Sequence, residues 1–162
     1  MGGVLRGALR LPLRAAMTAF QASRRAAWLV TRPETLGAHA VALSPAGEVI
    51  LIRHTYRRGW RLPGGGVKPG EDARAAVLRE LGEEIGMTEH GAVEWVGEVR
   101  HRPDFRRGIA QLFRVRGVRF RPPRWSVEVE EVRAFAPGAL PAGLPEITAR
   151  QLRMAGLLPD GR

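Results

Sequence analysis

Three acidic side chains at helical spacing, Glu80, Glu83 and Glu84, are the residues of this sequence best suited to chemistry. On an α-helix they fall within an arc of about 100°, at the edge of an apolar face. Like charges three or four residues apart cost an isolated helix about 0.2–0.5 kcal/mol per pair, so helix stability alone does not favour the grouping. A hard cation resolves the conflict, because Mg²⁺ prefers carboxylate oxygens and is usually held jointly by carboxylates and substrate phosphates. The spacing therefore indicates a metal site for phosphate chemistry.

Three consecutive glycines, Gly64, Gly65 and Gly66, precede these acids. Glycine lets the backbone turn sharply and come close to a ligand, where a side chain at Gly64 or Gly65 would obstruct it. Each feature alone also has an ordinary interpretation: the glycines as a flexible turn, and the glutamates as a solvated face balanced by Arg74 and Arg79.

The complete pattern resembles the Nudix box, the motif of the Nudix hydrolase family. Gly65 is followed after five residues by Glu71, and after seven more by the run Arg79-Glu80-Leu81-x-Glu83-Glu84-x-Gly86-Met87. Every specified position of the motif is matched. The resemblance extends over about residues 36–158 and includes the approach Trp60-Arg61-Leu62-Pro63 to the glycines.

The resemblance implies hydrolysis of a nucleoside diphosphate linked to another group, with Mg²⁺ or Mn²⁺ as cofactor. It implies that Glu83 and Glu84 are the principal metal ligands and that the Gly64 carbonyl is a backbone ligand. Glu80 is implied to be either a further ligand or the base that activates water.

Two further box residues are implied to act through other groups. Arg79 would orient Glu80, and Glu71 would pair with Arg79 as a structural brace. None of these assignments fixes the substrate. An 8-oxo-nucleoside triphosphate, a dinucleoside polyphosphate, ADP-ribose, a nucleotide sugar and NADH all remain open.

The substrate side is expected to include arginines near the glycines. Arg57, Arg58 and Arg61 flank the approach to the loop and are candidates to hold a distal phosphate, with a solvated charge run as the alternative. We also place Gly65 against the substrate, because its backbone can approach closely.

A carboxylate outside the box often completes such a site, and the acids Glu128, Glu130 and Glu131 are the candidates. Strand alternation would put Glu128 and Glu130 on one face and Glu131 on the other. We favour Glu128, and the alternative is that all three are surface acids that offset nearby arginines.

Composition limits the class of protein. A chain of 162 residues supports one full domain. The absence of cysteine excludes thiol catalysis and disulfides, and it agrees with a reducing, cytoplasmic location. The net charge of +10 comes from 26 basic residues, and all but Lys68 are arginines. This charge admits polyanionic substrates, nucleic acid or an acidic membrane surface.

The expected fold is an α/β sandwich with a mixed sheet, and the resemblance makes it a Nudix-type α/β/α sandwich with a loop-helix-loop catalytic motif. Hydrophobic patterns and turn residues predict the elements. They are a β-hairpin at 38–43 and 48–53, a helix at 72–85 closed by Gly86, strands at 93–100, 109–115 and 127–135, a loop at 137–145, and a helix at 146–157.

Residues 1–34 form a separate arginine-rich extension, and residues 35–162 form the Nudix domain. The first 33 residues contain no acid, and Leu5, Leu9 and Leu13 recur at helical spacing, interrupted by Pro12. Three interpretations remain open: a helical arm packed on the domain, a disordered or misassigned start with the true beginning at Met17 or later, and a peripheral anchor on anionic lipid.

Two other functions compete with a small-nucleotide hydrolase. The first is an RNA 5′-end pyrophosphohydrolase, because residues 100–124 hold nine arginines against one acid, and four of them alternate along 114–121. The second is a non-catalytic nucleotide-binding Nudix module. Such modules usually lose a box carboxylate, and none is lost here. The oligomeric state stays open, with a homodimer as one alternative.

Overall fold

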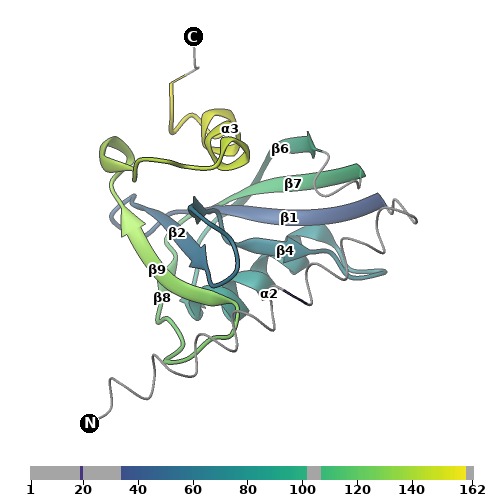
Figure 1. Ribbon diagram of the computed structural model, residues 1–162, viewed down its shortest axis with the longest axis horizontal. Coiled ribbons are helices and arrows are strands. Elements are labelled where there is room, and N and C mark those ends of the chain that lie inside the picture. The colour runs from purple at the N-terminus through teal and green to yellow at the C-terminus, as the bar shows by residue number, and fades with distance from the viewer. Residues whose placement is uncertain (1–18, 20–33, 102–106, 160–162) are drawn as a thin grey trace.

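The computed structural model describes residues 19, 34–101 and 107–159 (Figure 1). The chain forms a mixed α/β fold. Its strands are β1 (Glu34–Ala42), β2 (Val49–His54), β3 (Trp60–Arg61), β4 (Gly64–Gly66), β5 (Met87–Glu89), β6 (Val93–His101), β7 (Arg107–Val115), β8 (Arg119–Phe120) and β9 (Val129–Phe135). The helices are α2 (Ala73–Ile85), the 3-10 helix η2 (Pro137–Ala139) and α3 (Glu146–Met154).

The strands form two main sheets and a small pair. The larger sheet has the order β4-β1-β7-β6, with β1 and β7 parallel and the other neighbours antiparallel. The second sheet has the order β3-β2-β9 and is antiparallel. Strands β5 and β8 pair separately. The mixed sheet agrees with the expected fold class.

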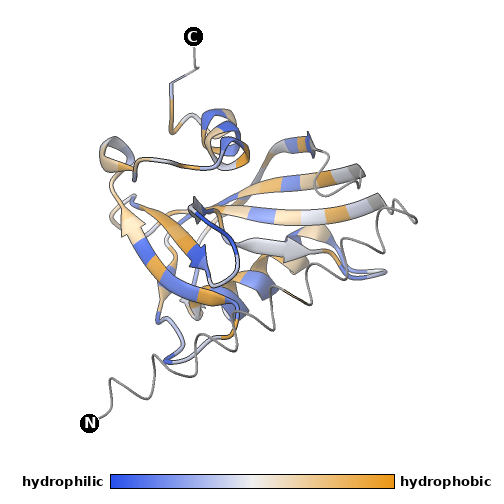
Figure 2. Cartoon of the chain, in the orientation of Figure 1, coloured by the Kyte–Doolittle hydropathy of each residue, from blue (hydrophilic) through white to orange (hydrophobic). Residues whose placement is uncertain are grey.

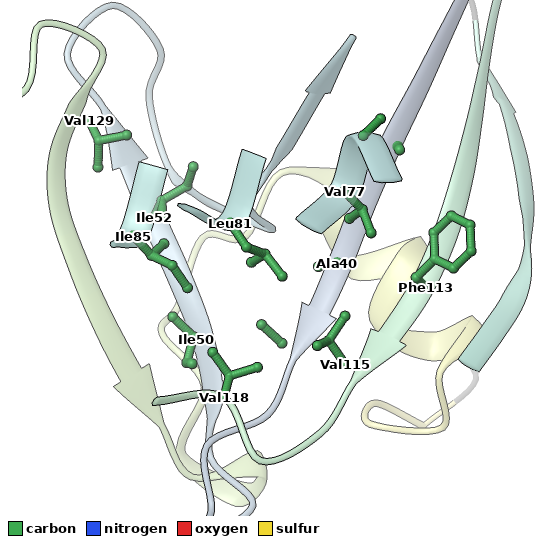
Figure 3. Packing of buried hydrophobic residues seen from close by; sticks show 13 residues of the cluster. Ala40, Ile50, Ile52, Val77, Leu81, Ile85, Phe113, Val115, Val118 and Val129 are labelled. Atoms are coloured by element: carbon green, nitrogen blue, oxygen red, sulfur yellow. The ribbon is translucent and has the colours of Figure 1, made fainter. Parts of the chain in front are cut away.

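Alternation along the central strands builds a core on each side of the sheets. On β2, Ile50 and Ile52 pack with residues of α2, whereas Val49 and Leu51 pack with Leu152 of α3. Figure 3 shows the α2 side, where the side chains of this helix lie against β1 and β2. Hydrophilic and hydrophobic positions follow one another along β7 and β9 (Figure 2). The strands therefore lie between two helices, as the α/β/α sandwich requires.

The predicted β-hairpin is wrong: its turn is present, but its two strands do not pair with each other beyond one bridge. Ser44 and Glu48 exchange turn hydrogen bonds, and a single bridge joins Leu43 to Val49. After that bridge, β1 pairs with β4 and β7, whereas β2 pairs with β3 and β9. Residues Val49 to Ile52 are all buried, so both faces of β2 pack against core side chains. The backbone hydrogen bonds of β2 are formed with β3 and β9 in the second sheet.

Helix α2 has the caps that its sequence indicates. The Asp72 carboxylate accepts the amides of Arg74 and Ala75 at 2.9 and 3.2 Å, which satisfies two amides of the first turn. Gly86 ends the helix with a φ of +66°. The strands expected at 93–100, 109–115 and 127–135 are present as β6, β7 and β9, and the last helix ends at Met154.

The expected extension at residues 1–34 lies outside the described residues, apart from residue 19 and Glu34, where β1 begins. Among the described residues, no helix combines the length and the apolar character needed to cross a membrane.

Candidate active site

Glu84 lies at the centre of the candidate site. Helix α2 turns this carboxylate toward β4, where its Oε2 accepts the Gly64 amide at 2.7 Å. The residue is only 7% exposed. Burial is the main reason why the pKa of Glu84 rises to about 8, although the hydrogen bond from Gly64 opposes the shift. The neighbouring carboxylates add to the rise; they belong to Glu80, Glu128 and Glu83.

The glycines of β4 permit a close approach between this strand and its neighbours. A Cβ on Gly65 would lie 2.6 Å from the Cδ and Oε1 atoms of Glu80. Gly64 has a φ of +142°, and a Cβ there would collide with the Ala38 carbonyl oxygen of β1. A Cβ on Gly66 would meet nothing within 4 Å. Packing against the β1 backbone thus requires the glycine at position 64, and Gly65 brings the backbone against a box carboxylate.

Arg79 connects the loop to the helix. Its Nε and Nη2 donate to the Glu71 carboxylate at 2.8 and 3.0 Å, and its Nη1 donates to Glu80 Oε1 at 2.7 Å. Nη2 also donates to the Gly66 carbonyl at 3.0 Å. The expected contacts of Arg79 with Glu71 and Glu80 are therefore present. The hydrogen bond from Arg79 lowers the pKa of Glu71 to about 2, helped by the amide of Lys68.

Glu83 is the most exposed of the three helix acids. Its side chain is 59% exposed, against 15% for Glu80, and its carboxylate lies 3.5 Å from Arg79 Nη1. The three acids therefore run from a buried carboxylate at Glu84 to a solvated one at Glu83. Glu83 is therefore the box acid most accessible from solvent, and its neighbouring cation is Arg79.

The acids near β9 divide into two groups. The Glu131 carboxylate lies 2.7 Å from Arg53 Nη2, and the Glu130 carboxylate lies 3.5 Å from Arg53 Nε. The register of β2 with β9 shifts between Arg53 and His54, so His54 pairs with Val129 and Glu130 is the extra residue. The expectation that Glu128 and Glu130 share a face assumed regular alternation, and this bulge interrupts that alternation at Glu130.

Glu128 belongs to the other group. It precedes β9 and is exposed, and among the described residues no cation pairs with it. Its charge contributes to the raised pKa of Glu84. Of the three candidates, Glu128 is the acid whose charge acts on Glu84.

Arg61 faces the same side of the sheets as the box acids. It is the register partner of Ile52, which packs in the α2-side core, and paired residues share a face of a sheet. The Nε of Arg61 is buried without a hydrogen-bond partner among the described residues. Burial lowers the pKa of Arg61, and the charge of Arg57 adds to this effect. Arg58 is exposed in the same connection.

His54 was not among the residues expected at the site. It ends β2, is buried, and its Nδ1 lies 3.3 Å from the Glu128 carbonyl oxygen. Burial, followed by the charge of Arg57, lowers the pKa of His54 to about 4. Nothing in the spacing of the sequence links His54 to Glu128, because the contact depends on the pairing of β2 with β9.

The donor set fits a divalent ion of the Mg²⁺ type. The described residues contain no group of three acidic or histidine side chains that forms a ready metal cage. Mg²⁺ does not need one, because it usually keeps several waters and takes one or two carboxylates together with substrate phosphates. Carboxylates that repel one another around a buried Glu84 would be relieved by such a cation.

The NUDIX domain model matches residues 33–155, which is most of the chain. This protein therefore belongs to the Nudix hydrolase family.

An RNA pyrophosphohydrolase of Acidiphilium cryptum is 42% identical over 93 residues, which cover 57% of this chain and 45% of the relative. A Bacillus subtilis relative, whose name proposes an 8-oxo-dGTP diphosphatase, is 40% identical over 52 residues, or 32% of this chain and 35% of the relative. The matched part of this chain thus spans less than half the length of these curated relatives.

Solved structures show the same fold. A MutT NUDIX hydrolase from Burkholderia pseudomallei superposes with a TM-score of 0.66 at 24% identity, covering 75% of this chain and 98% of that one. A MutT protein from Methanosarcina mazei has a TM-score of 0.59 at 25% identity and covers 77% and 95% of the two chains. The α/β/α sandwich expected from the sequence is confirmed.

Proposed function

We propose that this protein is a metal-dependent pyrophosphohydrolase that cleaves the phosphoanhydride bond of a nucleoside diphosphate linked to another group. The observation that carries the proposal is the set of box carboxylates around the buried Glu84, held against the backbone of Gly64 and Gly65. The absence of cysteine agrees with a cytoplasmic location for this enzyme.

In this proposal Glu83 and Glu84 are the principal ligands of Mg²⁺ or Mn²⁺, and the Gly64 carbonyl is a backbone ligand. The bound ion would neutralise charge on the diphosphate oxygens and make a coordinated water easier to deprotonate. Glu80 either adds a further ligand or accepts the proton of the attacking water. Its hydrogen bond from Arg79 Nη1 fixes the carboxylate for both roles.

The other residues bind the substrate phosphates or hold the loop against the helix. Glu71 holds Arg79 through two hydrogen bonds and so keeps the loop against the helix. Arg61 and Arg57 hold the distal phosphate, and Arg58 adds charge at the entrance. The unpartnered Nε of Arg61 supports this assignment, because a buried guanidinium donor without an acceptor is costly until an anion binds.

An RNA 5′-end pyrophosphohydrolase is the second candidate. The name of the Acidiphilium cryptum relative supports it, and a triphosphorylated end would present phosphates to the same arginines. The alternating arginines of 114–121 add little support. Arg114 and Arg116 lie within 3.6 Å of Glu94 on β6, and Arg119 lies 3.3 Å from Glu89 on β5. These three arginines therefore already form ion pairs within the protein.

Substitution of the metal ligands tests the proposal. We expect Glu83→Gln and Glu84→Gln each to lower turnover about a hundredfold or more with the fold intact, because they remove charge that stabilises the metal-bound transition state. The measurement is the rate at which nucleotides are split, with Mg²⁺, into two phosphate-bearing products, which mass spectrometry identifies. Glu89→Gln is the matched control, since Glu89 is an exposed acid that pairs with Arg119. Folded Glu83 and Glu84 variants with near-normal rates would refute the assignment.

A further inference from the structure

A tight turn precedes β9 and fixes the backbone of Glu128. The Ser126 hydroxyl accepts the amide of Glu128 at 3.3 Å and the amide of Val129 at 3.0 Å. Serine side chains commonly stabilise turns in this way. The hydrogen bonds leave the carbonyl groups of the turn facing the end of β2.

The end of β2 binds those carbonyl groups. The Thr55 hydroxyl donates to the Val127 carbonyl at 2.8 Å, and the Thr55 amide donates to the Glu128 carbonyl at 3.0 Å. The His54 ring nitrogen lies 3.3 Å from the same Glu128 oxygen. The peptide groups on both sides of the Glu128 side chain are therefore held by Thr55, which directly follows β2, and the second of them also lies beside His54, the last residue of β2.

The bulge explains why this attachment is needed. Glu130 is the extra residue of β9, and its carboxylate and that of Glu131 both lie within 3.5 Å of the Arg53 guanidinium. The strand pairing of β9 starts at Val129, so Glu128 lies just beyond the regular ladder. The main chain at such a position is prone to local opening unless other hydrogen bonds hold it, and its position sets the region that the Glu128 carboxylate can reach.

We propose that Thr55 is a positioning residue: its hydroxyl and amide hold the Val127 and Glu128 carbonyls so that the Glu128 carboxylate stays at the metal site beside Glu84. The inference rests on the proposed function, because it takes the box acids as a metal site, and it adds Glu128, the candidate favoured from the sequence, as the carboxylate that completes this site. It adds a group outside the box that acts on metal affinity through the backbone.

The test uses the full chain with three single substitutions, one double variant and one control. Thr55→Val removes the hydroxyl and keeps the shape, Thr55→Ser keeps the hydroxyl, and Glu128→Gln removes the carboxylate charge. The double variant of Thr55→Val with Glu128→Gln asks whether the two act together. Thr88→Val is the control, because the Thr88 hydroxyl also donates to a backbone carbonyl, that of Arg119 at 3.3 Å, on a different pair of strands.

The first readout is Mn²⁺ binding to the free protein, measured from the spin-resonance signal of unbound Mn²⁺. We expect Thr55→Val and Glu128→Gln each to weaken Mn²⁺ binding, Thr55→Val by about tenfold, as for other partners that orient a metal ligand. Thr55→Ser and Thr88→Val should bind as the wild type does. The double variant should bind no more weakly than Glu128→Gln alone.

Melting temperatures separate positioning from a purely structural role. A structural hydroxyl would lower the melting temperature of Thr55→Val and Thr88→Val alike and leave Mn²⁺ affinity unchanged, which would overturn the proposal. Additive losses in the double variant, or unchanged binding in Glu128→Gln, would also overturn it. If Thr55→Val does not fold, Ser126→Ala replaces it, with the same expected loss of affinity and the same lack of additivity with Glu128→Gln.

Hydrolysis measured in parallel separates the proposed function from the positioning role of Thr55. A wild type that binds Mn²⁺ with the expected pattern of losses, but hydrolyses no nucleotide, would overturn the proposed function and support the positioning role. A wild type that hydrolyses nucleotides and needs Glu83, but is indifferent to Thr55→Val, would support the function and overturn the positioning role.

Discussion

Glu84 is the residue whose surroundings conflict most with its charge. Its side chain is buried, and its carboxylate accepts a hydrogen bond from the Gly64 backbone amide. The nearby side chains of Glu80 and Glu83 on α2 are also acidic. A protein selected for stability alone would not place a carboxylate here, because burial of a charge is costly unless it is paired. The conflict is typical of a functional site.

The raised pKa of Glu84 predicts a dependence of stability on pH without metal. The folded-state pKa is about 8, above the ordinary value of 4.5, so the folded protein binds this proton more tightly than the unfolded chain. The free energy of unfolding should therefore fall as the pH rises from about 4.5 to about 8. Glu84→Gln should lack this loss. In thermal melts with a chelator, we expect it to melt above the wild type at pH 8 and close to it at pH 5.

Addition of Mg²⁺ should reverse the order, because an ion that binds only the folded wild type raises its melting temperature. If Glu84→Gln melts below the wild type at pH 8 without metal, the buried carboxylate is stabilised by its surroundings and the interpretation of Glu84 as an unpaired charge is wrong.

The loop-helix element was largely predictable because its signals are local. The cap at Asp72, the left-handed Gly86 and the positions of the box acids on α2 are set by residues a few places apart. The contacts of Arg79 with Glu71 and Glu80 followed from the resemblance to the family.

Pairing between distant strands was not predictable in the same way. The turn at Ser44 resembles that of a hairpin, yet β1 and β2 belong to different sheets. The bulge at His54 likewise breaks the alternation of the acids near β9, and no local pattern marks it. The sequence alone favoured Glu128 without excluding the other two acids, whereas the attachment of Glu128 to Thr55 required the structure.

The glycine strand β4 provides a test at the scale of the element. In Gly65→Ala, the new methyl group would push against the Glu80 carboxylate, which is the movable end of a side chain. We expect a folded protein whose turnover is about tenfold to a hundredfold lower, because the site tolerates little displacement of its groups. Steady-state kinetics and circular dichroism would measure both properties.

Gly66→Ala is the matched control, since its Cβ would meet nothing within 4 Å, and it should retain wild-type turnover. Gly64→Ala should instead lose stability, because its Cβ would collide with the β1 backbone at a positive φ. Equal rates in Gly65→Ala and Gly66→Ala would show that the contact between β4 and Glu80 has no part in turnover.

The whole molecule combines one α/β/α domain with the basic residues 1–34, whose structure lies outside the described residues. Both core clusters consist of residues from 38 onward, and every box residue lies beyond the extension. Neither the core nor the phosphate chemistry is therefore expected to need it. Contact of its arginines with an anionic membrane remains a proposal, supported by about 1 kcal/mol for each basic residue near such a surface.

A chain that begins at Arg32 tests the independence of the domain. We expect it to remain folded, to keep its turnover within a few-fold, and to lose any binding to phosphatidylserine vesicles that the full chain shows. Thermal melts, steady-state kinetics and vesicle sedimentation measure the three properties. A truncated protein that is folded yet inactive would show that the extension contributes to the active site and that the domain boundary is misplaced.

Hydrolysis of a phosphoanhydride by a metal at the box is the central claim, and a substrate panel with products identified by mass tests it most directly. The panel should contain 8-oxo-dGTP, a dinucleoside polyphosphate, ADP-ribose, a nucleotide sugar, NADH and a 5′-triphosphorylated RNA, each with Mg²⁺, Mn²⁺ or a chelator. We predict that at least one substrate is cleaved within its phosphate chain, with either metal required and the activity lost in Glu83→Gln. Absence of cleavage in the whole panel, or cleavage that persists with the chelator and in Glu83→Gln, would contradict the account.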